Sequence, residues 1–261
     1  MGVDRTVPPD GALRAAFERH FRVQMARRAA ELEEVHRLRY QVYCLEHAFE
    51  DPGQHAGGIE RDEFDAGSSH ALVRHLNTNA CAAVVRLVQA RRLHGRLLPI
   101  EAHCAASLYP EAQARIAGLP RSRLAEISRL AVSRAFKRRL AEAETVSGVS
   151  DQAVYADAQR GFDPMRQRGF PHITVGLFSA IVQLSVESDV THWLAVMEPT
   201  LLRLLRRFGI RFERIGHDVE YHGRRRPTLG VAADVVDGIL AERPDIWDLV
   251  TMGGRYLPPR A

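Results

Sequence analysis

Apolar side chains recur along the first half of the chain in patterns that predict one helix and three strands. Residues 31–45 have apolar positions at helical spacing, which predicts an amphipathic helix of about four turns. Residues 70–76 and 81–88 are apolar runs separated by Asn77-Thr78-Asn79, which predicts a β-hairpin. Residues 125–133 form a short apolar run bounded by basic residues, which is typical of a buried central strand.

The second half of the chain continues the alternation of helices and strands. Residues 175–184 and 201–208 carry apolar stripes at helical spacing, and Gly209 suits the end of the second helix. Between these helices, residues 192–197 read as a strand. Beyond them the sequence predicts one strand or a hairpin over residues 210–222 and a short helix over residues 231–240.

This order of elements predicts an α/β (α+β) fold with a mixed, mostly antiparallel central sheet and helices on both faces. We expect residues 1–30 to form a loosely attached N-terminal arm. Residues 31–228 should form one domain with a polar insertion at about 140–170, and residues 229–261 a C-terminal extension.

The central strand carries two ionisable side chains, Glu126 and Arg129, within an apolar run. Residues three apart in a regular strand point to opposite faces, so the pair cannot share one site without help. A β-bulge would reset the alternation and would leave backbone N–H groups unpaired. The pair is therefore either a structural ion pair or half of an active site, and the spacing leaves both open.

Other charged residues occupy positions where a polar partner is needed. Arg39 lies beside the apolar stripe of the first helix, and Arg86 interrupts an apolar strand. Asp62 and Asp65 belong to a segment with four acids in six residues, which alternatively is a solvated acidic loop. We expect Arg39, Asp62, Asp65, Arg86 and Arg129 to form one alternating charge network with Glu126. The alternative is an ion-pair lattice that does not contact substrate.

Composition narrows the class of protein. The chain has 261 residues and a net charge of +4, and Lys137 is its only lysine. Its arginine clusters suit an acidic partner, but no interleaved aromatic platform indicates nucleic acid. Three dispersed cysteines, without CxxC or HExxH, indicate neither a disulfide framework nor a zinc site. No apolar run approaches the ~18 residues of a membrane span, and the first residues lack a signal peptide, so we expect a cytoplasmic protein.

Several short motifs, taken in order, resemble known acyltransferases. The ordered set Arg39-x-x-Val42-Tyr43, Asp62-x-x-Asp65, Arg86 and Glu126-x-x-Arg129 resembles the acyl-homoserine lactone (autoinducer) synthases, which have the fold of the GCN5-related N-acyltransferases (GNAT). The residues around these motifs are more similar still to those of the acyltransferases associated with the PEP-CTERM/exosortase system. The segments that carry this second resemblance are Arg39–Glu46, Leu98–Glu101, Glu126–Val132, His192-Trp193, Met197-Glu198-Pro199, Glu220–Gly223 and Arg226-Pro227. Together the motifs cover about residues 30–228.

The resemblance implies a GNAT-like N-acyltransferase, related also to N-acyl amino acid synthases, that moves a fatty acyl group from a thioester to a small-molecule amine. Glu126 is the expected general base. Backbone N–H groups near Leu130, Ala131 and Val132 are the expected oxyanion donors. Both homoserine-lactone synthesis from S-adenosylmethionine and amino-acid N-acylation remain open. A non-catalytic acyl-binding or sensor module is the main alternative, and a nucleic-acid-binding module is a weaker one.

The donor is expected to be acyl carrier protein rather than free coenzyme A. The glycine-rich phosphate loop common to acetyltransferases is missing, because Arg134 is followed by Ala-Phe-Lys-Arg-Arg. We expect the carrier's phosphate to lie near four basic residues, Arg134, Lys137, Arg138 and Arg139. The acidic carrier surface should then contact Arg121 and Arg123, unless the segment is only a solvated basic turn. No bound cofactor and no metal are expected.

Overall fold

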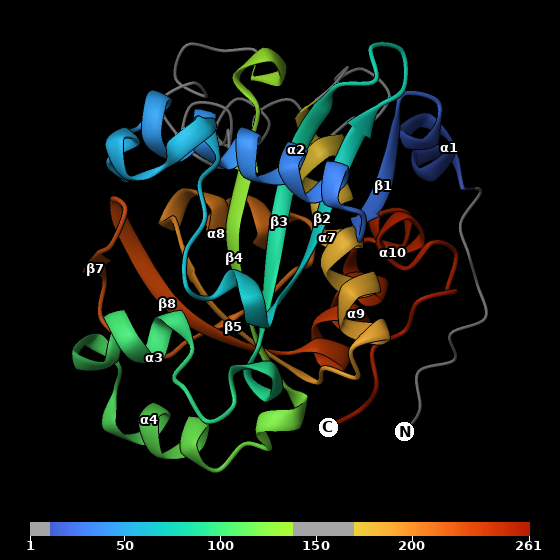
Figure 1. Cartoon of the computed structure of the whole chain (residues 1–261). Helices are drawn as coiled ribbons and strands as arrows, with labels where there is room; N and C mark the ends of the chain where they lie inside the picture. Colours follow the sequence, from blue (N-terminus) through green and yellow to red (C-terminus); the bar gives the residue numbers. More distant parts are fainter. Residues whose placement is uncertain (1–10, 138–169) are drawn as a thin grey trace.

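A mixed β-sheet forms the centre of the molecule (Figure 1). The computed structural model describes residues 11–137 and 170–261. Within them, seven of the eight strands follow the order β1-β2-β3-β4-β5-β8-β6, and the eighth, β7, pairs with β8. Neighbouring strands are antiparallel except β4 and β5, which are parallel. The strands are β1 (Phe21–Ala26), β2 (Ser68–His75), β3 (Cys81–Gln89), β4 (Leu124–Val132), β5 (His192–Met197), β6 (Glu213–Arg214), β7 (Val219–Glu220) and β8 (Arg224–Val231).

Helices cover both faces of this sheet. The helices are α1 (Ala12–Glu18), α2 (Ala29–Arg39), α3 (Pro99–His103), α4 (Pro110–Ala117), α7 (Phe170–Glu187), α8 (Pro199–Arg207), α9 (Ala232–Glu242) and α10 (Pro244–Thr251). Figure 1 shows α2 across the front of β2 and β3. Among the described residues, no helix has the length and apolar character that a bilayer crossing requires.

Alternating side chains of the strands divide the core into layers. Ala71 and Val73 of β2 belong to the large cluster that includes α7, whereas Leu72 between them packs in a separate cluster under α2. This period of two places α2 and α7 on opposite faces, because successive strand residues point to opposite sides. A third cluster lies under α3 and α4. The mixed sheet with helices on both faces, predicted from the sequence, is confirmed.

The two ends of the described chain are integral parts of this core. Phe17 of α1 and Phe21 of β1 are buried in the main cluster, and β1 pairs with β2 along its whole length. The loosely attached arm expected for residues 1–30 is therefore wrong for residues 12–26. At the other end, α9 and α10 also pack in the main cluster, with Trp247 buried. The expected extension at 229–261 is not separate, because its boundary divides β8. The expected insertion at 140–170 lies almost wholly outside the described residues.

Candidate active site

A pocket opens where the two parallel strands at the centre of the sheet separate. β4 and β5 pair only from Leu124↔His192 to Ile127↔Ala195, although both strands continue further. The pocket between them has a polar part and an apolar part. Its lining residues are Tyr43, Arg86, Pro99, Glu126, Ile127, Ser128, Arg129, Leu130, Phe178, Val196, Met197, Glu198, Leu201, Tyr221, His222 and Arg225. Such a pocket can hold an apolar chain with a reacting polar group at its end.

β4 has a bulge at the residues that border this pocket. In the register with β3, Val84 pairs with Ala131 and Arg86 pairs with Ser128. One residue of β3 therefore faces two of β4, Arg129 and Leu130, and Arg129 has a φ of +49°. The bulge that the Glu126–Arg129 spacing suggested is present. It resets the alternation so that both side chains line one pocket.

Because of the bulge, the three residues expected to bind an oxyanion differ in their strand pairing and in whether they line the pocket. Ala131 and Val132 pair with β3 and do not line the pocket. Leu130 lines the pocket and has no partner in the register with either β3 or β5. The geometry therefore supports an oxyanion-binding position at Leu130 and not at the two residues that follow it.

Glu126 lies deep in the pocket without an arginine partner. Its side chain is 2% exposed, and its Oε2 accepts a hydrogen bond of 2.7 Å from the backbone N–H of Ile100. Burial raises the pKa of Glu126 to about 8. The expectation that Glu126 joins the charge network is wrong, because within the described residues it makes no ion pair. A carboxyl group with a pKa near neutrality is suited to accept and return a proton.

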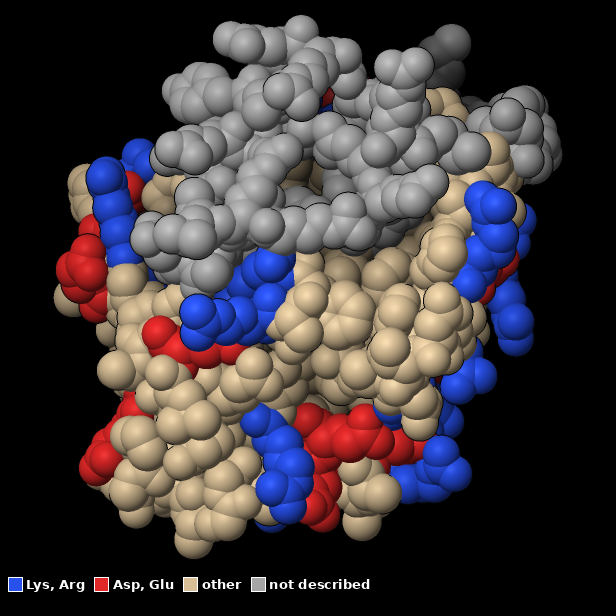
Figure 2. Space-filling model, turned by 90° about the horizontal axis from the view of Figure 1, so that it is seen from above, with Lys and Arg blue, Asp and Glu red and all other residues tan. Residues whose placement is uncertain are grey.

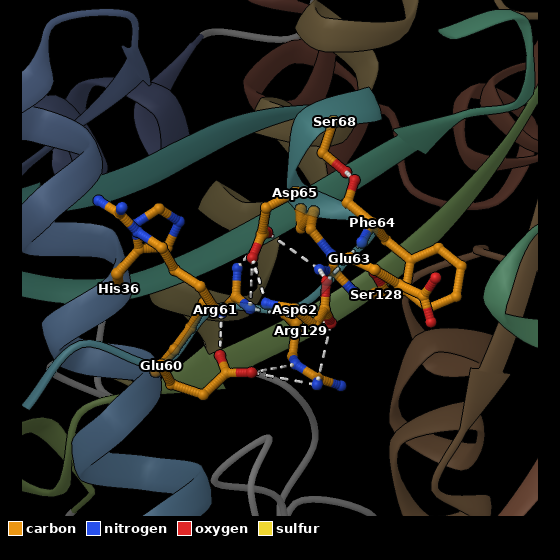
Figure 3. Close-up of polar contacts among 12 residues, drawn as sticks. His36, Glu60, Arg61, Asp62, Glu63, Phe64, Asp65, Ser68, Ser128 and Arg129 are labelled. Atoms are coloured by element: carbon orange, nitrogen blue, oxygen red, sulfur yellow. Dashed lines mark hydrogen bonds and ion pairs between the residues drawn. The ribbon is translucent and has the colours of Figure 1, made fainter. Parts of the chain in front are cut away.

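The five other predicted residues come together in one network of ion pairs. Figure 3 shows Asp62, Asp65 and Arg129 of this network. Arg39 binds Asp65 at 2.6 Å, and Arg86 binds Asp62 at 2.5 Å and Asp65 at 3.0 Å. Arg129 binds Asp62 at 3.1 Å. The acidic segment after residue 59 is thus an internal support for three buried arginines rather than a solvated loop.

The network has one central member that sequence reasoning missed, Glu60. It is fully buried and ion-paired to both Arg39 and Arg129. Burial opposes its ionisation, but the two arginines outweigh burial and hold the pKa of Glu60 below its usual value. Glu50 adds another contact to Arg129 at 2.9 Å, and the Tyr43 ring lies 4.9 Å from the Arg129 guanidinium. Three buried arginines with only two aspartates leave one positive charge without a carboxylate, and that count could have pointed to Glu60.

One group of side chains within the described residues has the spacing of metal ligands: His36, Asp65 and His70. Burial and then the nearby Arg39 lower the pKa of His36 to about 4 and of His70 to about 3. The Asp65 carboxylate is already shared by Arg39 and Arg86. A divalent cation would have to compete with these guanidinium groups, so the residues do not fit a metal and we assign none.

The basic residues expected to bind the carrier's phosphate are not equivalent. Arg134 is exposed just beyond the end of β4. Lys137 is buried and pairs with Glu46 at 3.1 Å, and burial lowers its pKa, so the expected phosphate contact is wrong for this residue. Arg138 and Arg139 lie outside the described residues. Figure 2 views the end of the sheet at which β4 finishes, and basic and acidic side chains are interspersed on its visible surface.

Arg121 and Arg123, the expected contacts for the carrier surface, lie at the other end of β4. Arg121 pairs with Glu101 at 2.7 Å, and Arg123 pairs with Asp189 at 2.7 Å. Both precede β4, whereas Arg134 follows it, and nine strand residues span ~30 Å. The expectation of one carrier contact covering both groups is therefore not supported.

The turn between β7 and β8 supplies pocket residues to which the sequence analysis gave no role. Tyr221 and His222 line the pocket, and their rings stack at 4.5 Å. His222 also reaches Glu50 at 3.2 Å. The motif Glu220–Gly223 contributed to the family resemblance, but nothing in its spacing placed it beside β4.

Comparisons with known proteins agree with this architecture. Residues 38–146 match the acetyltransferase (GNAT) domain family. The crystal structure of TofI, in a ternary complex with an inhibitor and MTA, superposes with a TM-score of 0.56 at 17% identity, covering 87% of this chain and 99% of TofI. The chain has a GNAT-like fold. The predicted fold class is thereby confirmed.

Two further structures share this GNAT-like fold. The acyl-homoserine lactone (AHL) synthase LasI has a TM-score of 0.56 at 17% identity, covering 85% of this chain and 95% of LasI. FeeM, an N-acyl amino acid synthase from uncultured soil microbes, has a TM-score of 0.52 at 14% identity, covering 85% of this chain and 96% of FeeM. The search of curated proteins gave no match. At these identities the likeness establishes the fold.

Proposed function

We propose that this protein is an N-acyltransferase that moves a fatty acyl group from a thioester to an amine. The observation that carries the proposal is Glu126, buried in the pocket between β4 and β5 with a pKa raised to about 8. An acyl-binding module has no need of a buried carboxyl group, whereas amine acylation needs a group that takes a proton near neutral pH. The AHL synthase and N-acyl amino acid synthase of the same fold support the proposal.

The reaction follows from the positions of these groups. The amine nitrogen attacks the thioester carbonyl carbon, and the π electrons of the carbonyl move onto its oxygen. Glu126, directly or through a water, takes a proton from the nitrogen. The backbone N–H of Leu130 stabilises the oxyanion. When the carbonyl re-forms, the carbon–sulfur bond breaks and the thiolate receives the proton that Glu126 held. An amide and a free thiol result.

The charge network positions this machinery. We propose that Arg39, Asp62, Asp65 and Arg86 hold the wall of the pocket opposite Glu126, and that Arg129 fixes the bulge through its carboxylate partners. Arg86 and Arg129 line the pocket, so these are the two residues at which the acceptor can contact the network. A carboxylate on the acceptor remains a proposed further partner of the arginines.

The donor is proposed to be acyl carrier protein. The argument is the missing glycine loop after β4 together with the exposed Arg134 at that position. BjaI, a CoA-dependent acyl-homoserine lactone synthase of the same fold, makes acyl-CoA the alternative donor. The acceptor is an amine, either an amino acid or S-adenosylmethionine. The association with a PEP-CTERM/exosortase system stays a prediction from sequence resemblance.

Glu126→Gln tests the proposal. We expect turnover of long-chain acyl-thioester with mixed amines to fall by roughly 10²–10⁴-fold, since a general base supplies about that factor. Wild-type turnover should rise with pH through an apparent pKa of about 8, the ionisation of Glu126, and the rise should vanish in the variant. Thiol release and mass spectrometry of lipids from overproducing cells provide the measurements.

Glu187→Gln is the matched control, because Glu187 pairs with Arg27 on the surface and does not line the pocket. It should retain wild-type turnover. Near-normal transfer by Glu126→Gln would exclude Glu126 as the base. Binding of acyl-thioester with no amine-dependent thiol release in the wild type would instead favour the acyl-binding module.

A further inference from the structure

Ser128 occupies the pocket between the proposed base and the bulge. It lines the pocket and is partly exposed to it. Glu126 and Ser128 are two residues apart and lie on the same face of β4, so their positions differ by ~7 Å. Arg129, the first residue of the bulge, follows directly. Ser128 thus lies beside the position at which an acyl carbonyl would meet both Glu126 and the bulge.

The hydroxyl of Ser128 has a fixed hydrogen-bonding direction. Arg86 Nε donates to Ser128 Oγ at 3.0 Å. The Arg86 guanidinium is itself held by Asp62 and Asp65 and is 1% exposed. A guanidinium offers donors only, so Oγ must accept this bond and its own proton must point elsewhere. Within the described part of the chain, that O–H donates to no other residue.

We propose that the Ser128 hydroxyl donates a hydrogen bond to the oxyanion of the tetrahedral intermediate, together with the backbone N–H of Leu130. This inference rests on the proposed acyltransferase function. The charged donor from Arg86 polarises the hydroxyl and strengthens it as a donor. The proton stays on Ser128 throughout. Because Arg86 already holds Oγ in place, no reorientation is needed when negative charge forms on the carbonyl oxygen.

A nucleophilic serine does not fit the same geometry. Oγ accepts a bond from a guanidinium donor, and within the described residues no hydrogen bond joins it to the nearest candidate base, Glu126, whose Oε2 accepts from the backbone N–H of Ile100. In a purely structural role, Ser128 would only accept the bond from Arg86, and its hydroxyl proton would have no acceptor among the described residues. The two roles predict different results.

Ser128→Ala should lower kcat by about 10²–10³-fold, the usual effect of losing one oxyanion donor, with little change in KM. Ser128→Thr keeps the hydroxyl and should retain most activity. Ser69→Ala is the matched control, since Ser69 also accepts bonds, from Gln89 and Arg92, but does not line the pocket. It should keep wild-type kcat.

Ligand binding separates catalysis from support of Arg86. One probe is a trifluoromethyl ketone analogue of acyl-pantetheine, whose hydrate mimics the tetrahedral intermediate; the other is the thioether, which has no carbonyl oxygen. By calorimetry, Ser128→Ala should bind the ketone at least 10-fold more weakly and the thioether as well as wild type does. Equal weakening for both probes, or for neither, would overturn the proposal.

Failure of the variant to fold, failure of the proposed function and failure of the role of Ser128 give different results. If Ser128→Ala does not fold, Ser128→Cys replaces it, and its weak S–H donor should also bind the ketone more weakly than wild type does. Wild-type binding of the ketone by that variant would overturn the proposal. If wild-type protein transfers no acyl group, the proposed function fails. If wild type transfers and Ser128→Ala transfers equally well, only the role of Ser128 fails.

Discussion

Glu126 and Asp65 show how the same fold shifts the pKa values of two carboxyl groups in opposite directions. Both are largely buried, and burial alone disfavours the charged form. Around Asp65, Arg39 and Arg86 outweigh burial and hold the pKa of Asp65 well below its usual range. Glu126 has only the Ile100 N–H as a direct partner, so burial dominates and its pKa rises to about 8. The two pKa values differ because Asp65 is ion-paired to two arginines, whereas Glu126 makes no ion pair within the described residues.

This raised pKa makes stability depend on pH. Because the pKa rises from 4.5 to about 8 in the folded state, that state binds the Glu126 proton more tightly than the unfolded chain does. Stability from this group is therefore present at low pH and is lost as pH rises from about 4.5 to above 8. Glu126→Gln should match wild type at pH 5 and exceed its unfolding free energy at pH 9 by up to about 5 kcal/mol. Urea unfolding at both pH values measures the difference, and equal stability at pH 9 would show that Glu126 is not desolvated.

Individual charged residues were predictable where they interrupt an apolar run. Arg86 and Glu126 stand out in this way, and the spacing of Glu126 and Arg129 also implied the bulge. Ser128 carried no such signal, because a serine is unremarkable in a half-buried strand. Its role depends on being opposite Arg86, and cross-strand register is set by the whole sheet rather than by local sequence.

Among the elements, β4 departs most from regular geometry. Its bulge places Arg129 at a φ of +49°, in the left-handed region that L-residues other than Asn, Asp and Gly rarely adopt. The ion pairs of Arg129 with Glu50, Glu60 and Asp62 hold the residue in this conformation. Arg129 thus combines a strained backbone conformation with ion pairs that hold its side chain.

Two substitutions separate these contributions. Arg129→Asn and Arg129→Val both remove the ion pairs, but only valine conflicts with the positive φ. We expect the valine variant to be less stable by about 1–2 kcal/mol. At Arg86, which has an ordinary strand backbone, the order should be reversed or level, since valine suits strands better than asparagine does. Thermal unfolding of the four variants checks the pattern; an equal ranking at both sites would argue against a strained bulge.

Elements were predicted best where most of their positions are apolar or where apolar residues repeat at helical spacing. The β2–β3 hairpin, β4, β5 and α8 follow such patterns. β1 alternates apolar residues with Arg22 and Gln24, a strand signal that the sequence analysis did not use, whereas β8 begins with three arginines and gave no such signal. Both pair with a more apolar strand and gain their structure from that neighbour.

Over the whole molecule, charge is mixed rather than gathered on one face. Most arginines described here have carboxylate partners, including Arg121 and Arg123, so the net charge of +4 overstates the positive surface open to a partner. Arg134 is exposed at the end of β4 that leads into the pocket. Electrostatic steering of an acidic carrier would therefore depend on a few local residues.

Charge reversal tests that dependence. Arg134→Glu, alone or with Arg138→Glu and Arg139→Glu, should weaken use of acyl carrier protein at low salt and leave a short acyl-pantetheine substrate unaffected. Arg22→Glu on β1 makes the same charge change on an exposed edge strand and is the control. Unchanged kcat/KM for the carrier substrate after reversal would place carrier docking elsewhere or favour coenzyme A as donor.

The short parallel pairing of β4 with β5 also bears on how the chain reaches its native state. β1 to β4 form one antiparallel set, and β5 with β8 forms a second set. Only four residue pairs join the two, and they come from segments more than 60 positions apart. Such long-range pairing closes a large loop and forms late, because the entropy of closure must be offset before the contacts exist. We therefore expect the candidate pocket to be the last part of the sheet to assemble.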